Sequence, residues 1–158
     1  MIVAGIDPGQ KGGYATLDTE TLEARAWPMP LNGKEPDVAA VLYQLRVDGV
    51  KAVAIEEVGA MPKQGVASTF QFGVGYGMLL GAIATSHMPH YRVRPQAWKK
   101  VVLAGTAKDK EAAIAFCRRA HPTLQLVPPR AKNPHDGMAD AVGIAHWLAR
   151  ILTGRAAA

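Results

Sequence analysis

The 158-residue chain contains a single cysteine, Cys117, which excludes an internal disulfide and makes a thiolate metal site improbable for want of partner ligands. Its first residues, MIVAGIDPG, lack the basic segment and long apolar run of a signal peptide. The most suspicious apolar stretch, GVGYGMLLGAIA, is too short and too rich in glycine for a membrane span. These absences predict a reduced, cytoplasmic protein with no membrane segment.

Aromatic residues make up only 6% of the chain and charged residues 20%, while 49% of residues are hydrophobic. This is ordinary globular composition, and the length suffices for one sizeable core. We predict one domain over residues 1–153 and a disordered tail over residues 154–158. The formal net charge of +5 favours a polyanionic partner such as nucleic acid.

The order of the expected elements favours an α/β fold with a mixed central sheet and helices on its faces. Apolar patterning predicts an antiparallel meander first, then strands that alternate with helices. The strands are expected near residues 2–7, 12–18, 22–29, 50–58 and 91–95, and the helices over 35–47, 65–86, from about 95, 108–120 and 136–152. The proline-broken, basic segment between the last two helices predicts a loop.

Four carboxylates fall at comparable places in this scheme. Asp7 ends the first strand, Glu56 ends a central strand, and Asp136 and Asp140 lie four residues apart on the final helix, so both lean to one side of it. If the two strands are neighbours and the helix packs across their ends, the acids converge and must either protonate or hold cations. Oxygen ligands select Mg²⁺ or Mn²⁺, and two such ions can clamp the reacting oxygens of a phosphodiester.

Each acidic position also has a simpler interpretation. The DPG sequence after the first strand is a common turn, and Glu56 with Glu57 could end a strand in solvent. Asp136 could be only a helix N-cap. The hypothesis of a metal site rests on the conjunction of all four acids.

Three segments in order, GIDPGQKGGYA, AIEEV and DGMADAVGIA, resemble the acidic motifs of RuvC-type Holliday junction resolvases, which belong to the RNase H-like superfamily. The resemblance spans nearly the whole chain. It implies an RNase H-like fold and a homodimeric endonuclease that makes paired nicks in four-way DNA junctions. It also implies two Mg²⁺ ions per active site, for which Mn²⁺ substitutes, and assigns the catalytic and metal-binding acids to Asp7, Glu56 and Asp140.

Two departures from the bacterial pattern concern the fourth acid and the DNA wedge. The bacterial motif spaces its last two acids three apart, whereas Gly137 stands at that place here, so Asp136 becomes the substitute, with His135 as a lesser helper. The bacterial aromatic after the strand glutamate is replaced by Gly59, which leaves Met61 or Phe70 as wedge candidates. The compact motifs resemble phage-encoded members.

The helix after Glu56 carries a stripe of small residues at every fourth position, which indicates close approach of another helix. Two partners stay open: the chain's own sheet or last helix, and a second copy of the chain in a dimer. The stripe consists of Gly65, Thr69, Gly73, Gly77, Gly81 and Thr85.

Basic residues near the acids in sequence are the expected contacts to DNA phosphates, which position a duplex without reading its bases. They are Lys63, Lys108, Lys110, Arg130 and Lys132. The tryptophans Trp27, Trp98 and Trp147 are expected to fill the core rather than stack on bases.

Three further functions compete with junction cleavage. An RNase H-like nuclease could act on other branched DNA or on an RNA:DNA hybrid, and a related fold could bind junctions without cutting them. A nucleotide-binding role, as DPG turns have in actin-like ATPases, lacks the further phosphate loops it would require.

Overall fold

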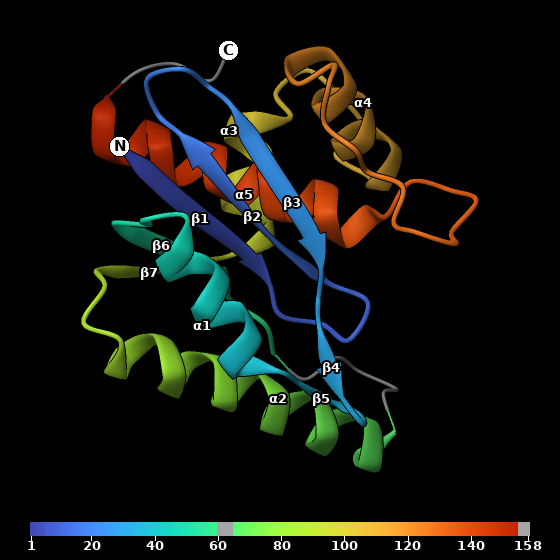
Figure 1. Ribbon diagram of the computed structural model, residues 1–158. Coiled ribbons are helices and arrows are strands. Elements are labelled where there is room, and N and C mark those ends of the chain that lie inside the picture. The colour runs from blue at the N-terminus through green and yellow to red at the C-terminus, as the bar shows by residue number, and fades with distance from the viewer. Residues whose placement is uncertain (60–64, 155–158) are drawn as a thin grey trace.

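The computed structural model describes residues 1–59 and 65–154, which form a mixed sheet with helices on both sides (Figure 1). The strands are β1 (Ile2–Asp7), β2 (Gly13–Asp18), β3 (Ala24–Pro28), β4 (Leu31–Asn32), β5 (Glu35–Pro36), β6 (Ala52–Glu56) and β7 (His90–Val93). The helices are α1 (Val38–Val47), α2 (Val66–Thr85), α3 (Pro95–Val102), α4 (Lys110–Ala120) and α5 (Asp136–Thr153).

The central sheet has the strand order β3-β2-β1-β6-β7. The pairs β1–β2 and β2–β3 are antiparallel, whereas β1–β6 and β6–β7 are parallel, so the predicted meander and mixed sheet are confirmed. Side chains of alternate strand residues point to opposite faces. Val3 and Leu17 join the core on the side of α3, α4 and α5, while Ile6 and Ile55 join the core under α1 and α2.

Helix α5 crosses the sheet with its backbone almost in contact with β1. A Cβ atom on Gly5 would lie 2.2 Å from the Ala141 carbonyl oxygen and 2.4 Å from the Ala145 amide nitrogen. Only glycine fits at such a close approach of backbone to backbone. The contact fixes the start of α5, and therefore its two aspartates, relative to the end of β1.

Helix α2 packs by one edge only. Leu79 and Ile83 are buried against the sheet, and a Cβ on Gly75 would lie 2.9 Å from Pro36 Cδ. On the other side, a Cβ on Gly73, Gly77 or Gly81 would meet nothing within 4 Å in the part of the chain that the structure describes. The expectation that the small-residue stripe packs against the chain's own sheet or last helix is therefore wrong for these glycines.

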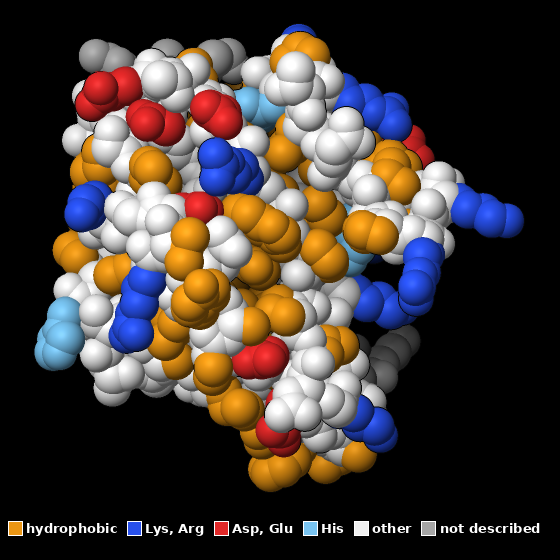
Figure 2. All heavy atoms as spheres, viewed as in Figure 1, with side chains coloured by type: hydrophobic (Ala, Val, Ile, Leu, Met, Phe, Trp, Pro, Cys, Tyr) orange, Lys and Arg blue, Asp and Glu red, His pale blue; other side chains and the backbone are white. Residues whose placement is uncertain are grey.

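The exposed side of α2 is apolar. Val66 is 87% exposed and Phe70 73%, and in Figure 2 hydrophobic side chains gather over the lower part of the face, where α2 and the β4–β5 hairpin lie. Within residues 1–59 and 65–154, α2 is the one helix long and apolar enough to cross a membrane, with a mean hydropathy of 1.3. Length and composition alone are weak grounds for a span, since helices of water-soluble domains also meet them.

Two helix starts differ from the sequence-based prediction. Glu35 and Pro36 form β5 with β4 instead of beginning a helix, and α1 starts after Asp37, whose side chain accepts a hydrogen bond from the Ala40 amide at 3.0 Å. Similarly, α4 starts at Lys110 because Asp109 caps it by accepting from the Ala112 amide at 2.8 Å. An aspartate N-cap ends the run of non-helical residues in both cases. Of the predicted tail, residues 155–158 lie outside the described residues.

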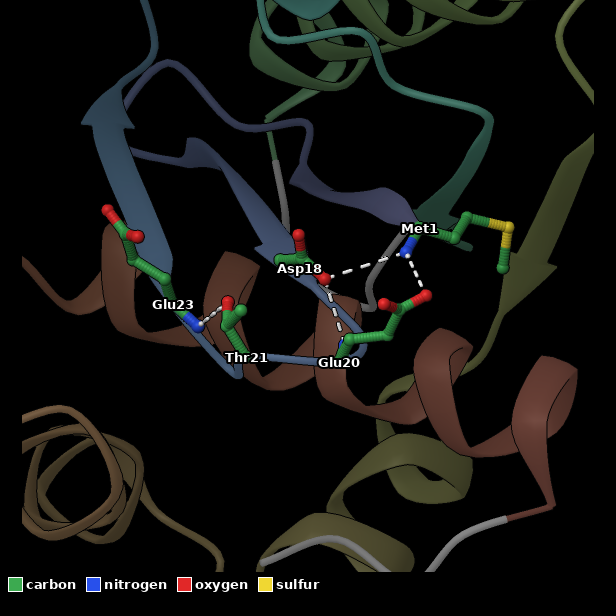
Figure 3. A network of polar contacts seen from close by, with 5 residues as sticks. All are labelled: Met1, Asp18, Glu20, Thr21 and Glu23. Carbon is green, nitrogen blue, oxygen red and sulfur yellow. Dashed lines mark hydrogen bonds and ion pairs between the residues drawn. The ribbon is translucent and has the colours of Figure 1, made fainter.

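A second group of acids contacts the start of β1, at the other end of the strand from Asp7 (Figure 3). The Met1 amino group lies 3.5 Å from Asp18 Oδ1 and 3.3 Å from Glu20 Oε1, and Asp18 also accepts from the Glu20 amide at 2.8 Å. Because Ile2 pairs with Asp18 and Asp7 pairs with Gly13, these acids lie one strand length from Asp7. They close the β2–β3 turn and are separate from the predicted metal site.

Candidate metal and nucleic-acid site

Asp7 and Glu56 lie at the same edge of the sheet, as predicted. Ile6 pairs with Ile55 in the parallel register of β1 and β6, so the next residue on each strand ends it beside its neighbour. The turn after β1 folds back on itself, with the Gly12 amide donating to the Gly9 carbonyl at 2.8 Å. The Gly9 amide also approaches Asp7 Oδ1 at 3.5 Å.

Asp140 and Asp136 from α5 lie close enough to the two strand ends for their charges to act on Asp7. Burial, followed by the charges of Glu56 and Asp140, raises the pKa of Asp7 to about 7. Burial, with the charges of Glu56 and Asp136 and against that of Lys99, raises the pKa of Asp140 to about 6. The predicted convergence of the carboxylates is thus present, and the cluster is short of positive charge.

A buried oxygen of Asp140 tests whether this cluster suits a cation. Asp140 Oδ1 is buried and has no hydrogen-bond partner among the described residues, a situation that costs roughly 1–3 kcal/mol for a polar atom and more for a charged group. A hard divalent cation would satisfy this oxygen, and the donors around it are all carboxylates, the ligands that Mg²⁺ and Mn²⁺ prefer. The chemistry of the donor set therefore fits the metal that the motifs imply.

The carboxylates of the described residues are nevertheless not arranged as a complete set of metal ligands. Within the described residues, no group of three or more His, Cys, Asp or Glu side chains is arranged to hold a metal. One reason is that Asp136 is engaged elsewhere, because its Oδ2 accepts a charged hydrogen bond from Lys110 Nζ. This contact lowers the pKa of Asp136 and raises that of Lys110, so Lys110 supplies one positive charge beside the cluster.

Asp136 is not the N-cap of α5. His135 occupies that position, and its Nδ1 accepts a hydrogen bond from the Met138 amide at 3.2 Å, so Asp136 is the first helical residue. The N-cap interpretation of Asp136 is therefore wrong. His135 therefore has a structural task at the helix start, and its role as a helper at the site stays a prediction.

Gly137 explains why the fourth acid cannot stand three residues before Asp140. A Cβ at this position would lie 2.5 Å from Gly12 Cα and from the Lys11 carbonyl oxygen, and Gly12 and Gly137 form a backbone bridge. Any side chain there would push α5 away from the turn that follows Asp7. The acid next to this position, Asp136, is free of that clash.

Two neighbouring residues of α3 reach the cluster, and sequence reasoning missed both roles. Trp98 is fully buried, as expected of a core residue, but its Nε1 donates a hydrogen bond to Glu56 Oε1 at 2.7 Å. Lys99 lies over the Trp98 ring at 5.2 Å, and its charge lowers the pKa of both Glu56 and Asp140. For Glu56, burial is the larger influence and raises the pKa.

Glu57 points away from the other acids. Its two carboxylate oxygens lie 3.3 Å from Arg92 and 3.5 Å from Arg94, both on or just after β7. The adjacent acid of the EE pair is therefore neutralised at the sheet edge, and Glu56 alone faces the cluster.

The basic residues predicted to contact DNA lie at different places. Lys110 lies at the acidic cluster, whereas Lys108, Arg130 and Lys132 are exposed in the segments that lead into α4 and α5. Lys63, like the wedge candidate Met61, lies outside the described residues.

A mixed five-stranded sheet of this order, crossed by a C-terminal helix that brings acids to the ends of two parallel strands, defines a protein of the RNase H-like class. Two structures of Thermus thermophilus RuvC, each 27% identical, have TM-scores of 0.68 and 0.66. Each match covers 99% of this chain and 99% or 98% of the other, and the second structure holds a Holliday junction substrate.

The yeast mitochondrial Holliday junction resolvase shares the fold at 13% identity, with a TM-score of 0.59 over 94% of this chain and 77% of that chain. No protein-family model and no curated protein sequence matches the sequence. Over its whole length the chain is thus similar to RuvC-type members of the RNase H-like superfamily, in agreement with its three acidic motifs.

Proposed function

We propose that the chain is a structure-selective DNA endonuclease that resolves four-way junctions by paired nicks. The observation that carries the proposal is the convergence of Asp7, Glu56 and Asp140, all partly buried, at one sheet edge of a RuvC-type fold. The likeness to Thermus RuvC in complex with a Holliday junction supports the junction as substrate. A cytoplasmic location, expected from the sequence, stays a prediction.

Asp7, Glu56 and Asp140 would hold two Mg²⁺ or Mn²⁺ ions, with Asp136 as the fourth ligand. When bound, such ions stabilise the charge that develops on the attacking and leaving oxygens of a phosphodiester. In this account Asp7 and Asp140 stay ionised near neutral pH because the cations offset the burial and repulsion that raise their pKa values. Lys110, which donates to Asp136, would supply a cation for a DNA phosphate where Asp136 serves as a ligand.

The remaining basic residues have a positioning role in this proposal. Lys108, Arg130 and Lys132 are exposed and carry the cationic groups that contact phosphates, and Lys63 would join them. Phe70, 73% exposed near the start of α2, is the described candidate for the wedge that separates bases at the junction. Binding should weaken steeply with added salt, since each phosphate contact releases counterions.

We propose a homodimer that uses the open side of α2. Gly73, Gly77 and Gly81 leave space for close approach of a second helix, and the exposed apolar side chains of Val66 and Phe70 lie near the start of the same helix. A twofold dimer would also present two active sites to two symmetric strands of a junction. Gly77→Leu is expected to give a folded monomer, because the new side chain enters open space in one chain but blocks a second helix.

Sedimentation of wild-type protein and Gly77→Leu measures this outcome, and Gly75→Leu is the matched control. Gly75 faces Pro36 of its own chain, so a leucine there should unfold the helix instead of changing the oligomer. A wild-type monomer at tens of micromolar would contradict the dimer.

The test of the function compares labelled four-way junction, linear duplex and RNA:DNA hybrid, each incubated with protein in Mg²⁺. Paired nicks in the junction alone are expected. Cleavage of the hybrid or of any branched DNA equally well would assign another target, and binding of the junction in Mg²⁺ without cleavage would make the protein a junction binder.

A further inference from the structure

Trp98 is fully buried in the core and also donates a hydrogen bond to a carboxylate of the candidate site. Its side chain is fully buried among apolar residues of the cluster under α5, yet its only polar atom, Nε1, lies 2.7 Å from Glu56 Oε1. Buried indole N–H groups usually find a partner, and backbone carbonyls are the common one. Here the partner is a carboxylate at the candidate metal site, forty-two residues away in the chain.

The position of the Trp98 ring is fixed from behind by α5. A Cβ on Gly143 would lie 2.5 Å from Trp98 Cζ3, so the glycine leaves the space into which the six-membered ring fits. Lys99, the next residue on α3, lies 5.2 Å from the ring centre on its outer face. The indole therefore has one orientation, with its N–H directed to the end of β6.

We propose that Trp98 is a positioning residue that presents Glu56 to the metal ions through this hydrogen bond, seated by Gly143. The inference rests on the proposed metal-dependent function. The indole N–H donates to Oε1 of Glu56, which would fix the rotation of the carboxylate and favour Oε2 as the oxygen offered to a cation. Outer partners that orient ligands in this way typically contribute about 10–100-fold to metal affinity or activity.

A purely structural role makes a different prediction. If Trp98 only fills the core, shortening its ring should lower the melting temperature in the presence and absence of metal alike. If it orients Glu56, loss of the N–H should also weaken the response to metal. The two effects are separable because binding of an ion to the folded state alone raises the melting temperature by an amount that grows with the logarithm of the ratio of ion concentration to Kd.

The experiment follows thermal unfolding during titration with Ca²⁺ alone, for wild type, Trp98→Phe and the matched control Trp147→Phe. Trp147 is a partly buried tryptophan that packs against the same apolar cluster, on α5. Trp98→Phe should need at least about tenfold more Ca²⁺ than wild type for the same rise in melting temperature, whereas Trp147→Phe should follow the wild-type curve. In a Glu56→Gln background, Trp98→Phe should add no further change, because the oriented ligand is already lost.

Site-specific replacement of Trp98 by benzothienylalanine, which keeps the ring shape without the N–H, serves if Trp98→Phe does not fold. Junction cleavage in Mn²⁺ is measured on the same proteins. Wild type that neither cleaves nor responds to Ca²⁺ would overturn the proposed function and this inference with it. Wild type that does both, with a Trp98 variant of unchanged Ca²⁺ response, would overturn the inference alone.

Discussion

Helices α5 and α2 both carry glycines, but those of α5 are closely packed within the chain, whereas three of those in α2 are not. In α5, Gly137 and Gly143 lie where a Cβ would come within 2.5 Å of the turn after β1 and of the Trp98 ring. In α2, Gly73, Gly77 and Gly81 face open space. Glycine costs about 1 kcal/mol relative to alanine inside a helix, so each set needs a compensating contact.

The two helices differ in where the compensating contact for their glycines comes from. In α5 the contact lies within the chain: close approach to β1 and to Trp98 brings Asp136, Asp140 and Glu56 to one place. In α2 the described residues of this chain supply no contact at three of the glycines, and in the proposed dimer a second chain would supply it. The site therefore depends on α5, and the proposed assembly depends on α2.

Asp140→Asn is the change expected to have the largest effect on activity. It removes the charge of the most deeply placed ligand on α5, so cleavage of a four-way junction in Mg²⁺ should fall by orders of magnitude, while gel shifts in Ca²⁺ should show junction binding that is equal or tighter. Asp7→Asn should behave in the same way. Nicking near the wild-type rate by either variant would remove that residue from the metal site.

Asp136→Asn should also lower the cleavage rate by orders of magnitude and raise the Mg²⁺ concentration needed, because the fourth negative charge is lost. Since His135 is the cap of α5, a loss of capping cannot produce this result. Cleavage measured across a Mg²⁺ titration provides the readout, with Asp109→Asn as a control at a true N-cap. A wild-type titration curve would reduce Asp136 to the ion-pair partner of Lys110.

Alanine substitutions at glycines of the two helices should change stability in opposite directions. Gly137→Ala should lower the free energy of unfolding by about 1–3 kcal/mol, because its methyl group meets the backbone of Lys11 and Gly12. Gly77→Ala should raise the stability of the monomer by up to about 1 kcal/mol through helix propensity. Urea unfolding at low protein concentration compares the two, and equal losses would show that α2 is packed as closely as α5.

A buried histidine pair under α5 should make stability fall in acid. His121 Nε2 lies 2.7 Å from His146 Nε2, and burial lowers the pKa of both rings, that of His146 to about 4. Each histidine has a folded pKa below its unfolded value, so the unfolded chain binds more protons below pH 6.5. The contribution to stability is thus complete above pH 6.5 and is lost as pH falls toward 4.

Urea unfolding of wild type and His146→Gln at pH 7 and pH 4.5 isolates this smaller effect, because the acids of the metal site are common to both proteins. Those acids act in the opposite direction: Asp7 and Asp140 have raised pKa values, so they favour the metal-free fold at low pH. The wild type should lose more stability than His146→Gln on acidification. An equal loss would mean that the pair does not stay neutral.

The positions of Asp7, Glu56 and Asp140 could be predicted because regular geometry decides them: parallel strand ends meet at one edge, and helix spacing aligns the acids on α5. The role of Gly137 could not, since it depends on how closely α5 approaches a turn more than a hundred residues earlier in the chain. The Trp98 hydrogen bond was missed for the same reason, because nothing in the local sequence distinguishes its N–H from that of a core tryptophan.

The sequence predicts separate roles for Asp136, as a metal ligand, and for Lys110, as a contact to DNA. It does not predict the direct hydrogen bond between the two side chains. The start of α1 was predicted too early because the helical pattern of apolar residues extends back to Glu35. Glu35 and Pro36 instead pair with Leu31 and Asn32 as a strand, so the helix begins only after Asp37. For the α2 stripe, the sequence left two partners open, and the open space at Gly73, Gly77 and Gly81 removes one of them.

Anomalous diffraction from crystals soaked in Mn²⁺ tests the central claim most directly, because it locates the ion independently of activity. The account predicts manganese peaks between the carboxylates of Asp7, Glu56 and Asp140, with Asp136 released from Lys110 and turned toward the metal. Absence of manganese at these carboxylates, with Asp136 still held by Lys110, would contradict it.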